Sequence, residues 1–189
     1  HVDDLDDFFS GVSLLLSKNG TMVIEVPYSK DMVDGSEFDT IYHEHLSYWS
    51  VSSMSTVLRR HGLSISAIEH HDVYGGSLRF TINRGNSVSD EVLGWIEKET
   101  EGSMIHEFAS NCERIRDGFL AMLHGAKERS VSICGYTAPA KSTVLLNYCG
   151  VGTDLIPVIL DSTNVQRDLV RGRPRPHSAE RAVKPALQY

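Results

Sequence analysis

The segment LSISAIEHHDVYGGSLRFTIN, residues 63–83, decides the fold that we expect for this chain. Its two ends, residues 63–70 and 77–83, are rich in apolar side chains and predict two β-strands. The intervening HDVYGG, residues 71–76, carries two consecutive glycines, which are typical of a turn. We therefore expect two strands that follow each other closely in one sheet.

The segments before this pair predict a strand and a helix. TMVIEVP, residues 21–27, is expected to form another strand of the sheet. The helix is expected to begin at Ser50 or Ser52, to carry the apolar residues Met54, Val57 and Leu58, and to end at Gly62. Strands that alternate with helices favour an α/β fold whose sheet is at least partly parallel.

Apolar side chains recur at helical intervals in two further segments. The segment from Val2 predicts a helix that stops at Asn19 and Gly20, with the stripe Val2, Leu5, Phe8, Val12 and Leu15. Residues 104–127 predict a long helix with the stripe Ile105, Phe108, Cys112, Ile115, Phe119 and Met122. After it, VSICGY, APAKSTVLLNYCG and LIPVILD predict strand, helix and strand.

Length and composition are those of an ordinary soluble globule. The 189 residues suggest one large domain or two small ones, with 41% hydrophobic and 23% charged residues. No apolar run approaches the roughly 20 residues of a membrane span, and no secretory signal pattern opens the chain. The three cysteines, Cys112, Cys134 and Cys149, are widely spaced and fit free thiols. We expect a cytoplasmic protein that does not associate with membranes.

The two ends of the chain are unusual. Residues 164–189 hold six Lys/Arg against two acids, a local charge of +4 in a chain whose net charge is -7. Such a Pro/Arg-rich tail could bind nucleic acid or acidic lipid, but we expect a disordered or aberrant tail and no nucleic-acid partner. Because His1 is not a methionine and a helical pattern follows at once, we expect a piece of a longer protein.

The segment IYHEHLSYWS, residues 41–50, concentrates proton-handling and aromatic groups. Histidine is the natural general base near neutral pH, a carboxylate can orient it, and a tyrosine can stabilise a developing oxyanion. Two other interpretations remain open from composition. One is a loop whose polar groups satisfy one another, and the other is a metal site built from His43, Glu44, His45, His70 and His71.

A second candidate is GYTAPAKST, residues 135–143, between a predicted strand and helix. It resembles a phosphate-binding loop in Gly135, Lys141 and Ser142, but Ala140 replaces the second glycine and Pro139 removes a backbone donor. An ATPase is therefore disfavoured. A helix N-terminus beside a lysine still attracts anions such as a diphosphate, and a plain turn with a solvated lysine is the alternative.

Several of these blocks together resemble one family. TIYHEHLSYWS, HGL, YGGSLRFTI, GYTAPAKSTVLLNYCG and DLIPVILD occur here in the order found in sugar C-methyltransferases, over about residues 1–163. Those enzymes use S-adenosylmethionine to methylate a ketosugar carried by a nucleoside diphosphate. The resemblance implies the second half of a Rossmann-like class I methyltransferase sheet at residues 1–86. It implies a long helix and a partial second α/β domain at residues 87–163.

The resemblance also implies roles for particular residues. His45 matches the general base, Glu44 its carboxylate neighbour and Tyr42 the tyrosine of the same block, while His1 matches a further active-site histidine. Substrate-binding positions fall on Gly75, Gly76, Arg79, Tyr136 and Lys141. Tyr74 stands where the family has a histidine, and Thr137 and Ser142 stand where it has glycines.

What the family places upstream is absent from this sequence. The glycine-rich turn for S-adenosylmethionine and the zinc-binding cysteines would precede His1, so no metal site is expected here. We therefore expect the 189 residues alone to bind the cofactor weakly and to be inactive. A rival hypothesis is a non-catalytic nucleotide-sugar binding module or the product of a pseudogene. The particular sugar and the oligomeric state are not predicted.

Overall fold

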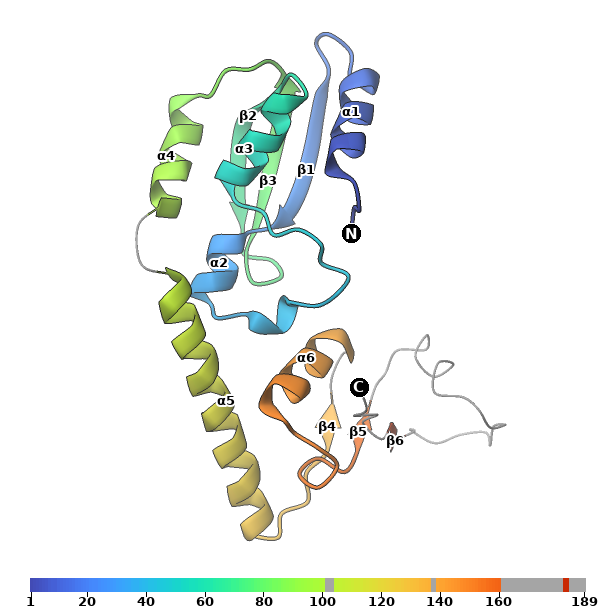
Figure 1. The fold of residues 1–189 in the computed structure, drawn as a ribbon, viewed down its shortest axis with the longest axis vertical. Coiled ribbons are helices and arrows are strands. Elements are labelled where there is room, and N and C mark those ends of the chain that lie inside the picture. The colour runs from blue at the N-terminus through green and yellow to red at the C-terminus, as the bar shows by residue number, and fades with distance from the viewer. Residues whose placement is uncertain (101–103, 137–138, 161–181, 184–189) are drawn as a thin grey trace, which may run out of the picture. The chain divides into compact units, whose positions relative to one another are not determined.

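A computed structural model describes residues 1–100, 104–136, 139–160 and 182–183 (Figure 1). The chain divides into two compact units. The first unit comprises residues 1–37 and 43–109, and the second comprises residues 38–42 and 110–189. This division falls further along the chain than the expected boundary after residue 86. Each unit is considered by itself below.

The sheet of the first unit has three strands. They are β1 (Thr21–Pro27), β2 (Leu63–His71) and β3 (Ser77–Arg84), in the spatial order β1-β3-β2. All three strands were predicted. Because β3 is antiparallel to both neighbours, β1 and β2 run parallel to each other on either side of it. The expected parallel pairing does not occur within this sheet, because the close β2–β3 turn inserts a reversed strand between β1 and β2. A parallel pair does occur in the second unit.

One face of this sheet carries the core. Alternate side chains of the central strand, Leu78, Phe80 and Ile82, are completely buried, while those between them are polar. The helices α1 (Leu5–Leu15), α3 (Val51–Arg60) and α4 (Asp90–Thr100) contribute to the same core with Phe9, Met54, Leu58 and Val92. The short α2 (Ser29–Asp34) follows β1 directly. Helix α4 was not predicted.

The apolar stripe of α1 differs from the expected one. Phe9 is 1% exposed and packs in the core with Leu5, Val12 and Leu16, whereas Phe8 is 37% and Leu15 90% exposed. Phe8 and Phe9 are adjacent, as are Leu15 and Leu16, so a stripe through either member of each pair has helical spacing. The helix turns the second residue of each pair inward.

Helix α3 begins as predicted, at an N-cap serine. The Ser50 hydroxyl accepts a hydrogen bond from the Ser53 backbone N–H at 3.0 Å, and the Ser53 hydroxyl bonds back to Ser50, which completes a capping box. The carboxylate of Glu99, at the end of α4, accepts the N–H groups of Val51 and Ser52 at 2.5 and 3.0 Å. A negative group at a helix N-terminus is favourable, so α4 secures the start of α3.

The second unit contains a smaller core. Helix α5 (Met104–Glu128), most of which lies in this unit, and helix α6 (Pro139–Cys149) pack around Leu123, Leu146, Cys149, Val151, Leu155 and Ile156. The 3-10 helix η1 (Phe38–Thr40) places the Phe38 ring 4.7 Å from the ring of Tyr148. In α5, Ile115 and Met122 are exposed, contrary to the predicted stripe, and Leu123 is buried instead.

The strands of the second unit are shorter than predicted. Within the described residues, the two predicted strands form as β4 (Gly135–Tyr136) and β5 (Ile159–Leu160), which pair in parallel, and a third strand, β6 (Ala182–Val183), pairs with β5 antiparallel. The rest of the predicted disordered tail lies outside the described residues, as does Asp161. Among the described helices, none is long and apolar enough to cross a membrane.

Candidate functional site

The histidine-rich segment forms an irregular loop at the carboxyl end of β1. Residues 41–48 adopt turns and coil, so the strict alternation of an extended strand does not apply to them. The end of the loop is tied to β1 because Trp49 bridges to Tyr28, and its carbonyl accepts the Ser29 N–H at 2.8 Å. Because Ser50 caps α3 and Trp49 is bonded to the segment that follows β1, the end of the loop is fixed by two neighbouring elements.

Three rings meet in this loop. The imidazole of His45 lies edge-to-face with that of His1, at a centroid distance of 5.3 Å and an interplanar angle of 78°. The ring of Tyr48 lies at 6.3 Å from His45 in the same type of contact. His45 is half-buried, so its ring is positioned by neighbours and yet reachable from solvent. An imidazole in that setting can exchange protons with a bound molecule.

Glu44 and Tyr42 are the other predicted residues of the loop. Glu44 is exposed, and its side chain forms no hydrogen bond or ion pair within the described part of the chain. Tyr42 belongs to the second unit. The roles assigned to Glu44 and Tyr42 therefore stay predictions.

The turn between β2 and β3 requires glycine at two positions. Gly75 and Gly76 have φ values of +87° and +120°, and Tyr74 before them adopts +54°. A Cβ on Gly75 would collide with the carboxylate of Glu37, and one on Gly76 would collide with that of Asp31. The two glycines thus admit acidic side chains against the turn, and Tyr74 projects into solvent, being 86% exposed.

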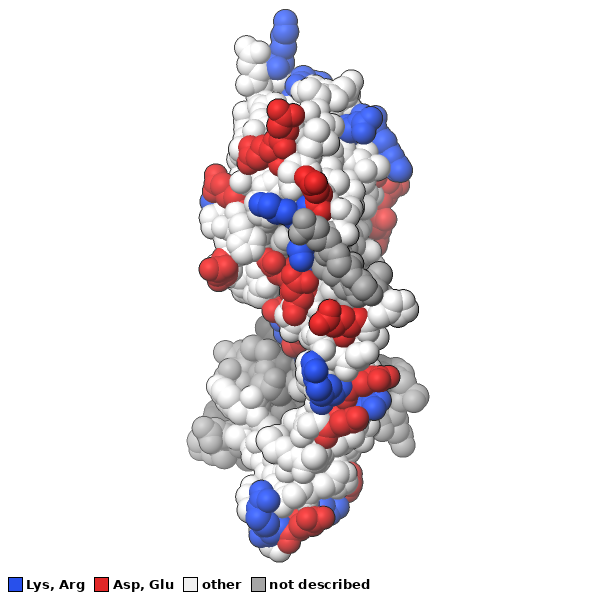
Figure 2. Space-filling view, turned by 90° about the vertical axis from the view of Figure 1, so that its left-hand side faces the viewer, with Lys and Arg blue, Asp and Glu red and all other residues white. Residues whose placement is uncertain are grey.

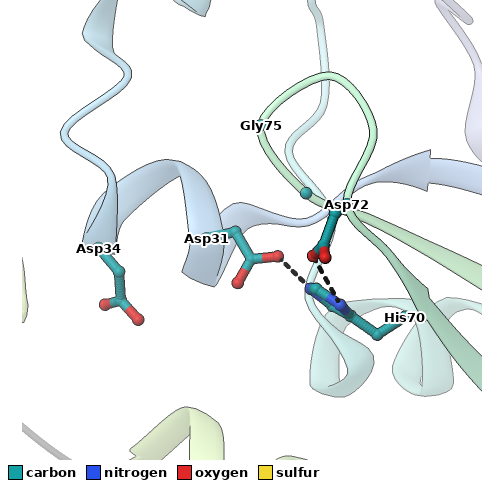
Figure 3. A pocket seen from close by; sticks show the side chains of 6 residues that line it. Asp31, Asp34, His70, Asp72 and Gly75 are labelled. Atoms are coloured by element: carbon teal, nitrogen blue, oxygen red, sulfur yellow. Dashed lines mark hydrogen bonds and ion pairs between the residues drawn. The ribbon is translucent and has the colours of Figure 1, made fainter.

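A pocket of about 330 Å³ opens beside this turn. Its lining residues are Asp31, Asp34, His70, Asp72, Gly75 and Gly76. Figure 3 shows the His70 ring between two carboxylates, with Nε2 2.6 Å from Asp31 and Nδ1 3.7 Å from Asp72. Carboxylate oxygens accept hydrogen bonds from hydroxyl groups. Asp31 and Asp34 were missed from the sequence, because nothing local pairs Asp31 with a histidine 39 residues away, and Asp34 forms an ion pair with Lys30 on its own helix.

Arg79 lies on the sheet face opposite the core. It stands across from Glu25 on β1 and Glu69 on β2, with nitrogen–oxygen distances of 2.8 and 3.4 Å. The central position on β3 thus gives one guanidinium two carboxylate neighbours. This cross-strand triad holds Arg79 in place on the open face.

The remaining predicted residues belong to the second unit. Tyr136 on β4 is 75% exposed, and Lys141 is exposed in the first turn of α6. Thr137 and Ala138, between them, lie outside the described residues. The first turn of an 11-residue helix with a lysine keeps the geometry expected of an anion-attracting end.

The histidines weighed as metal ligands have other neighbours. Nε2 of His71 is 3.4 Å from Glu69, and His70 lies against Asp31. Within the described residues, no group of three or more His, Cys, Asp or Glu side chains could hold a metal ion. The proposed set with His43, Glu44 and His45 is therefore not assembled there.

Tyr28 is a buried polar residue that sequence reasoning did not single out. It is 3% exposed, and its hydroxyl has no hydrogen-bond partner among the described residues. Burial, followed by the nearby Glu99 carboxylate, raises the pKa of this phenol. Its ring lies edge-to-face with those of His70 and Trp95, so it packs between the pocket and α4.

Comparison with known proteins identifies the family. A family model described as C-methyltransferase C-terminal domain matches residues 72–175, more than half of the chain. The chain belongs to the C-methyltransferase family. The match extends past residue 163, where we expected the family pattern to stop, and it begins in the β2–β3 turn. It therefore covers Gly75, Gly76, Arg79, Tyr136 and Lys141 but not the histidine-rich loop.

A curated relative extends the similarity toward the beginning of the chain. This C-methyltransferase, NovU of Streptomyces niveus, is 33% identical over 171 residues, which is 86% of this chain. The chain spans only 41% of the length of that relative. Membership in the C-methyltransferase family thus rests on two comparisons, and the activity of a whole enzyme is considered separately.

Proposed function

We propose that this chain is part of an S-adenosylmethionine-dependent C-methyltransferase that acts on a deoxyketosugar linked to a nucleoside diphosphate. Family membership and the relative named C-methyltransferase support carbon methylation. The observation that carries the proposal is the half-buried His45 imidazole, held by the rings of His1 and Tyr48 at the carboxyl end of β1. Ligands of α/β proteins commonly bind at that end of the strands.

The chemistry requires a base beside a ketone. A ring nitrogen of His45 takes a proton from the carbon next to the carbonyl. The electron pair of the C–H bond forms the C=C bond of the enolate, and the π pair of the C=O bond moves onto the oxygen. The enolate oxygen that results needs a hydrogen-bond donor, which His1 or Tyr42 supplies. Glu44 favours the protonated imidazole that forms, by its charge. A positioned acid–base group contributes about 10²–10⁴-fold to a rate.

The described residues do not contain the binding site expected for S-adenosylmethionine. S-adenosylmethionine supplies the methyl group in such a reaction, and its recognition uses a glycine-rich turn between a strand and a helix. The glycines with positive φ in the described residues are Gly62, Gly75, Gly76, Gly85 and Gly150. Of these, Gly85 stands between a strand, β3, and a helix, α4, but it is the single glycine of residues 85–89, so this connection is not glycine-rich. The described residues therefore do not fit the cofactor, and no step of its binding is derived from them.

The sheet order supports a place at the end of a larger methyltransferase sheet. Its final two strands form the antiparallel hairpin β2–β3, while the other outer strand, β1, has a free edge within the described residues. We expect the 189-residue chain to bind S-adenosylmethionine weakly. Isothermal calorimetry that gave a dissociation constant of about 1 μM for the chain would contradict this.

Substrate binding is proposed for both units. In the second unit, Lys141 and the exposed Tyr136 ring offer charge and stacking for a nucleoside diphosphate, and in the first unit Arg79 offers a guanidinium for a phosphate. The turn at Gly75 and Gly76 permits the substrate to approach the backbone. A substrate phosphate bound to Arg79 would share the guanidinium with the carboxylates of Glu25 and Glu69.

Proton removal can be tested without the cofactor. A nucleoside-diphosphate ketosugar in D₂O is incubated with the chain, and proton NMR follows deuterium incorporation next to the carbonyl. We expect His45→Asn to slow this exchange by about 10²-fold, while the neighbouring His43→Asn, the matched control, changes it by less than about threefold. Equal exchange by His45→Asn and the unaltered chain would refute the assigned base.

The rival function is a non-catalytic nucleotide-sugar binding module. The exposed Lys141 at the start of α6 favours it, because that end attracts diphosphate without any catalysis. Binding of the nucleotide sugar with no exchange above the solvent rate would support the module. Exchange that depends on His45 would support the enzyme.

A further inference from the structure

The four arginines of the first unit differ in their partners. Arg79 pairs with two glutamates, and Arg84 donates to the carbonyls of Ser13 and Leu16 at the end of α1. The side chains of Arg59 and Arg60 form no ion pair or hydrogen bond with any described residue. These two unpaired guanidiniums nevertheless lie together.

Both unpaired arginines line one hollow of about 490 Å³. Its lining residues are Thr56, Arg59, Arg60 and Asn86. Thr56 precedes Arg59 and Arg60 by three and four residues, so all three share one side of α3. Among the described residues that line this hollow there is no carboxylate, although the chain as a whole is acidic.

The position of Asn86 is fixed by the backbone. Helix α3 ends at Arg60, and Gly62, whose φ is +68°, follows it. The Gly62 carbonyl accepts the N–H of Gly85 at 2.9 Å. This bond ties the segment after β3 to the end of α3, and it places Asn86 beside the arginines. The hollow is thus formed by two connected elements.

The dipole of α3 explains why cationic residues lie in its last turn, but it does not explain why their side chains line a hollow without partners in the described part of the chain. Arg59 and Arg60 in the last turn complement the negative end of α3. Neither guanidinium, however, hydrogen-bonds to a carbonyl of the described residues, as Arg84 does for α1. Their donors remain available to an external acceptor.

We propose that this hollow binds the phosphate or diphosphate group of a soluble ligand. Guanidinium forks match the oxygens of phosphate, and the Asn86 amide adds a neutral donor. Helix α3 is about 15 Å long and has the histidine-rich loop at its other end, so the hollow is separate from the candidate catalytic site. In Figure 2, Lys and Arg side chains lie at the upper end of the face, with acidic side chains close below them.

The test uses inorganic pyrophosphate as the probe and the full chain. Titration followed by ¹H–¹⁵N NMR is expected to shift the amides of residues 56–62 and 85–86, with a dissociation constant of about 1 mM at low salt that weakens as salt is added. The double variant Arg59→Gln/Arg60→Gln is expected to bind at least about tenfold more weakly. The control double variant Arg114→Gln/Arg129→Gln removes the same charge from α5 and is expected to bind as the unaltered chain does.

Three results would overturn the proposal. They are the absence of saturable shifts up to about 10 mM pyrophosphate, equal weakening in both double variants, and shifts confined to other residues. Sedimentation with phosphatidylglycerol vesicles separates a second source of phosphate. Arginine-dependent vesicle binding without pyrophosphate binding would assign the hollow to a lipid surface and refute a soluble ligand.

Discussion

The two compact units of the chain are stabilised to different degrees. In the first unit, twelve buried residues pack on a sheet whose strands are seven to nine residues long. In the second, the core cluster has six buried residues and the described strands are two residues long. Because burial of apolar surface is the main favourable term in folding, we expect the first unit to unfold at the higher temperature. A loop held at the end of the first sheet is then a stable position for a catalytic base.

The largest expected effect tests this difference in stability. Phe80 is completely buried in the central strand, and Phe80→Ala should lower the free energy of unfolding of the first unit by about 3–5 kcal/mol. Leu146→Ala, in the smaller core, should lower that of the second unit by about 2 kcal/mol. Scanning calorimetry with hydrogen exchange measured by mass spectrometry assigns each transition. If either variant shifted both units equally, the division into two units would be wrong for stability.

A smaller effect is expected in the β2–β3 turn. Gly76→Ala places a Cβ at positive φ and against Asp31, so we expect a loss of about 1–3 kcal/mol and displacement of Asp31 from His70. Chemical denaturation measures the loss, and the NMR signals of the His70 ring report the displacement. Gly118→Ala in α5 is the control, because a Cβ there meets nothing within 4 Å and should add up to about 1 kcal/mol. Unchanged stability of Gly76→Ala would show that the turn adapts.

Next in size is the cap of α3. Ser50→Ala removes the hydroxyl that accepts the Ser53 N–H, and it should cost about 1 kcal/mol in the first unit. Ser52→Ala is the matched control, since the backbone N–H of Ser52 keeps its bond to Glu99. Urea denaturation of both variants makes the comparison. Equal losses would mean that Glu99 alone secures the start of the helix.

Strands and helix caps were predicted from the sequence more accurately than the side of each helix that packs in the core. All three strands of the first sheet and the Ser50 cap were predicted, because alternation, turn glycines and capping residues are short-range signals. The stripe of α1 was wrong because Phe8 and Phe9 are adjacent, and only packing against the sheet selects between them. Helix α4 was missed although it completes the core with Val92.

The candidate site was predictable only where residues are close in sequence. His45 and Tyr48 share one loop, but the approach of His1 to His45 was expected from family resemblance and not from any pattern. The contact between Asp31 and His70 depends on how β1 and β2 end beside the same turn. Such contacts depend on the order and pairing of the strands, which cannot be derived from local patterns in a single sequence.

The smallest expected effect concerns Tyr28, where the well-packed first unit contains an unsatisfied group. Its hydroxyl is buried without a hydrogen-bond partner, and an unsatisfied buried group costs about 1–3 kcal/mol, so Tyr28→Phe should leave stability unchanged or raise it by about 1 kcal/mol. Since burial raises the pKa of Tyr28 in the folded state, its contribution is fully present below about pH 10, the value in unfolded chains, and is lost as pH rises above it.

Urea denaturation between about pH 8 and pH 11 measures both consequences. The unaltered chain should lose stability more steeply than Tyr28→Phe above about pH 10, because the unfolded chain releases a proton that the folded chain retains. Tyr74→Phe, at an exposed tyrosine, is the control and should keep the steep dependence. A clear loss of stability in Tyr28→Phe at neutral pH would mean instead that the hydroxyl has a partner, with the Glu99 carboxylate as the nearest candidate.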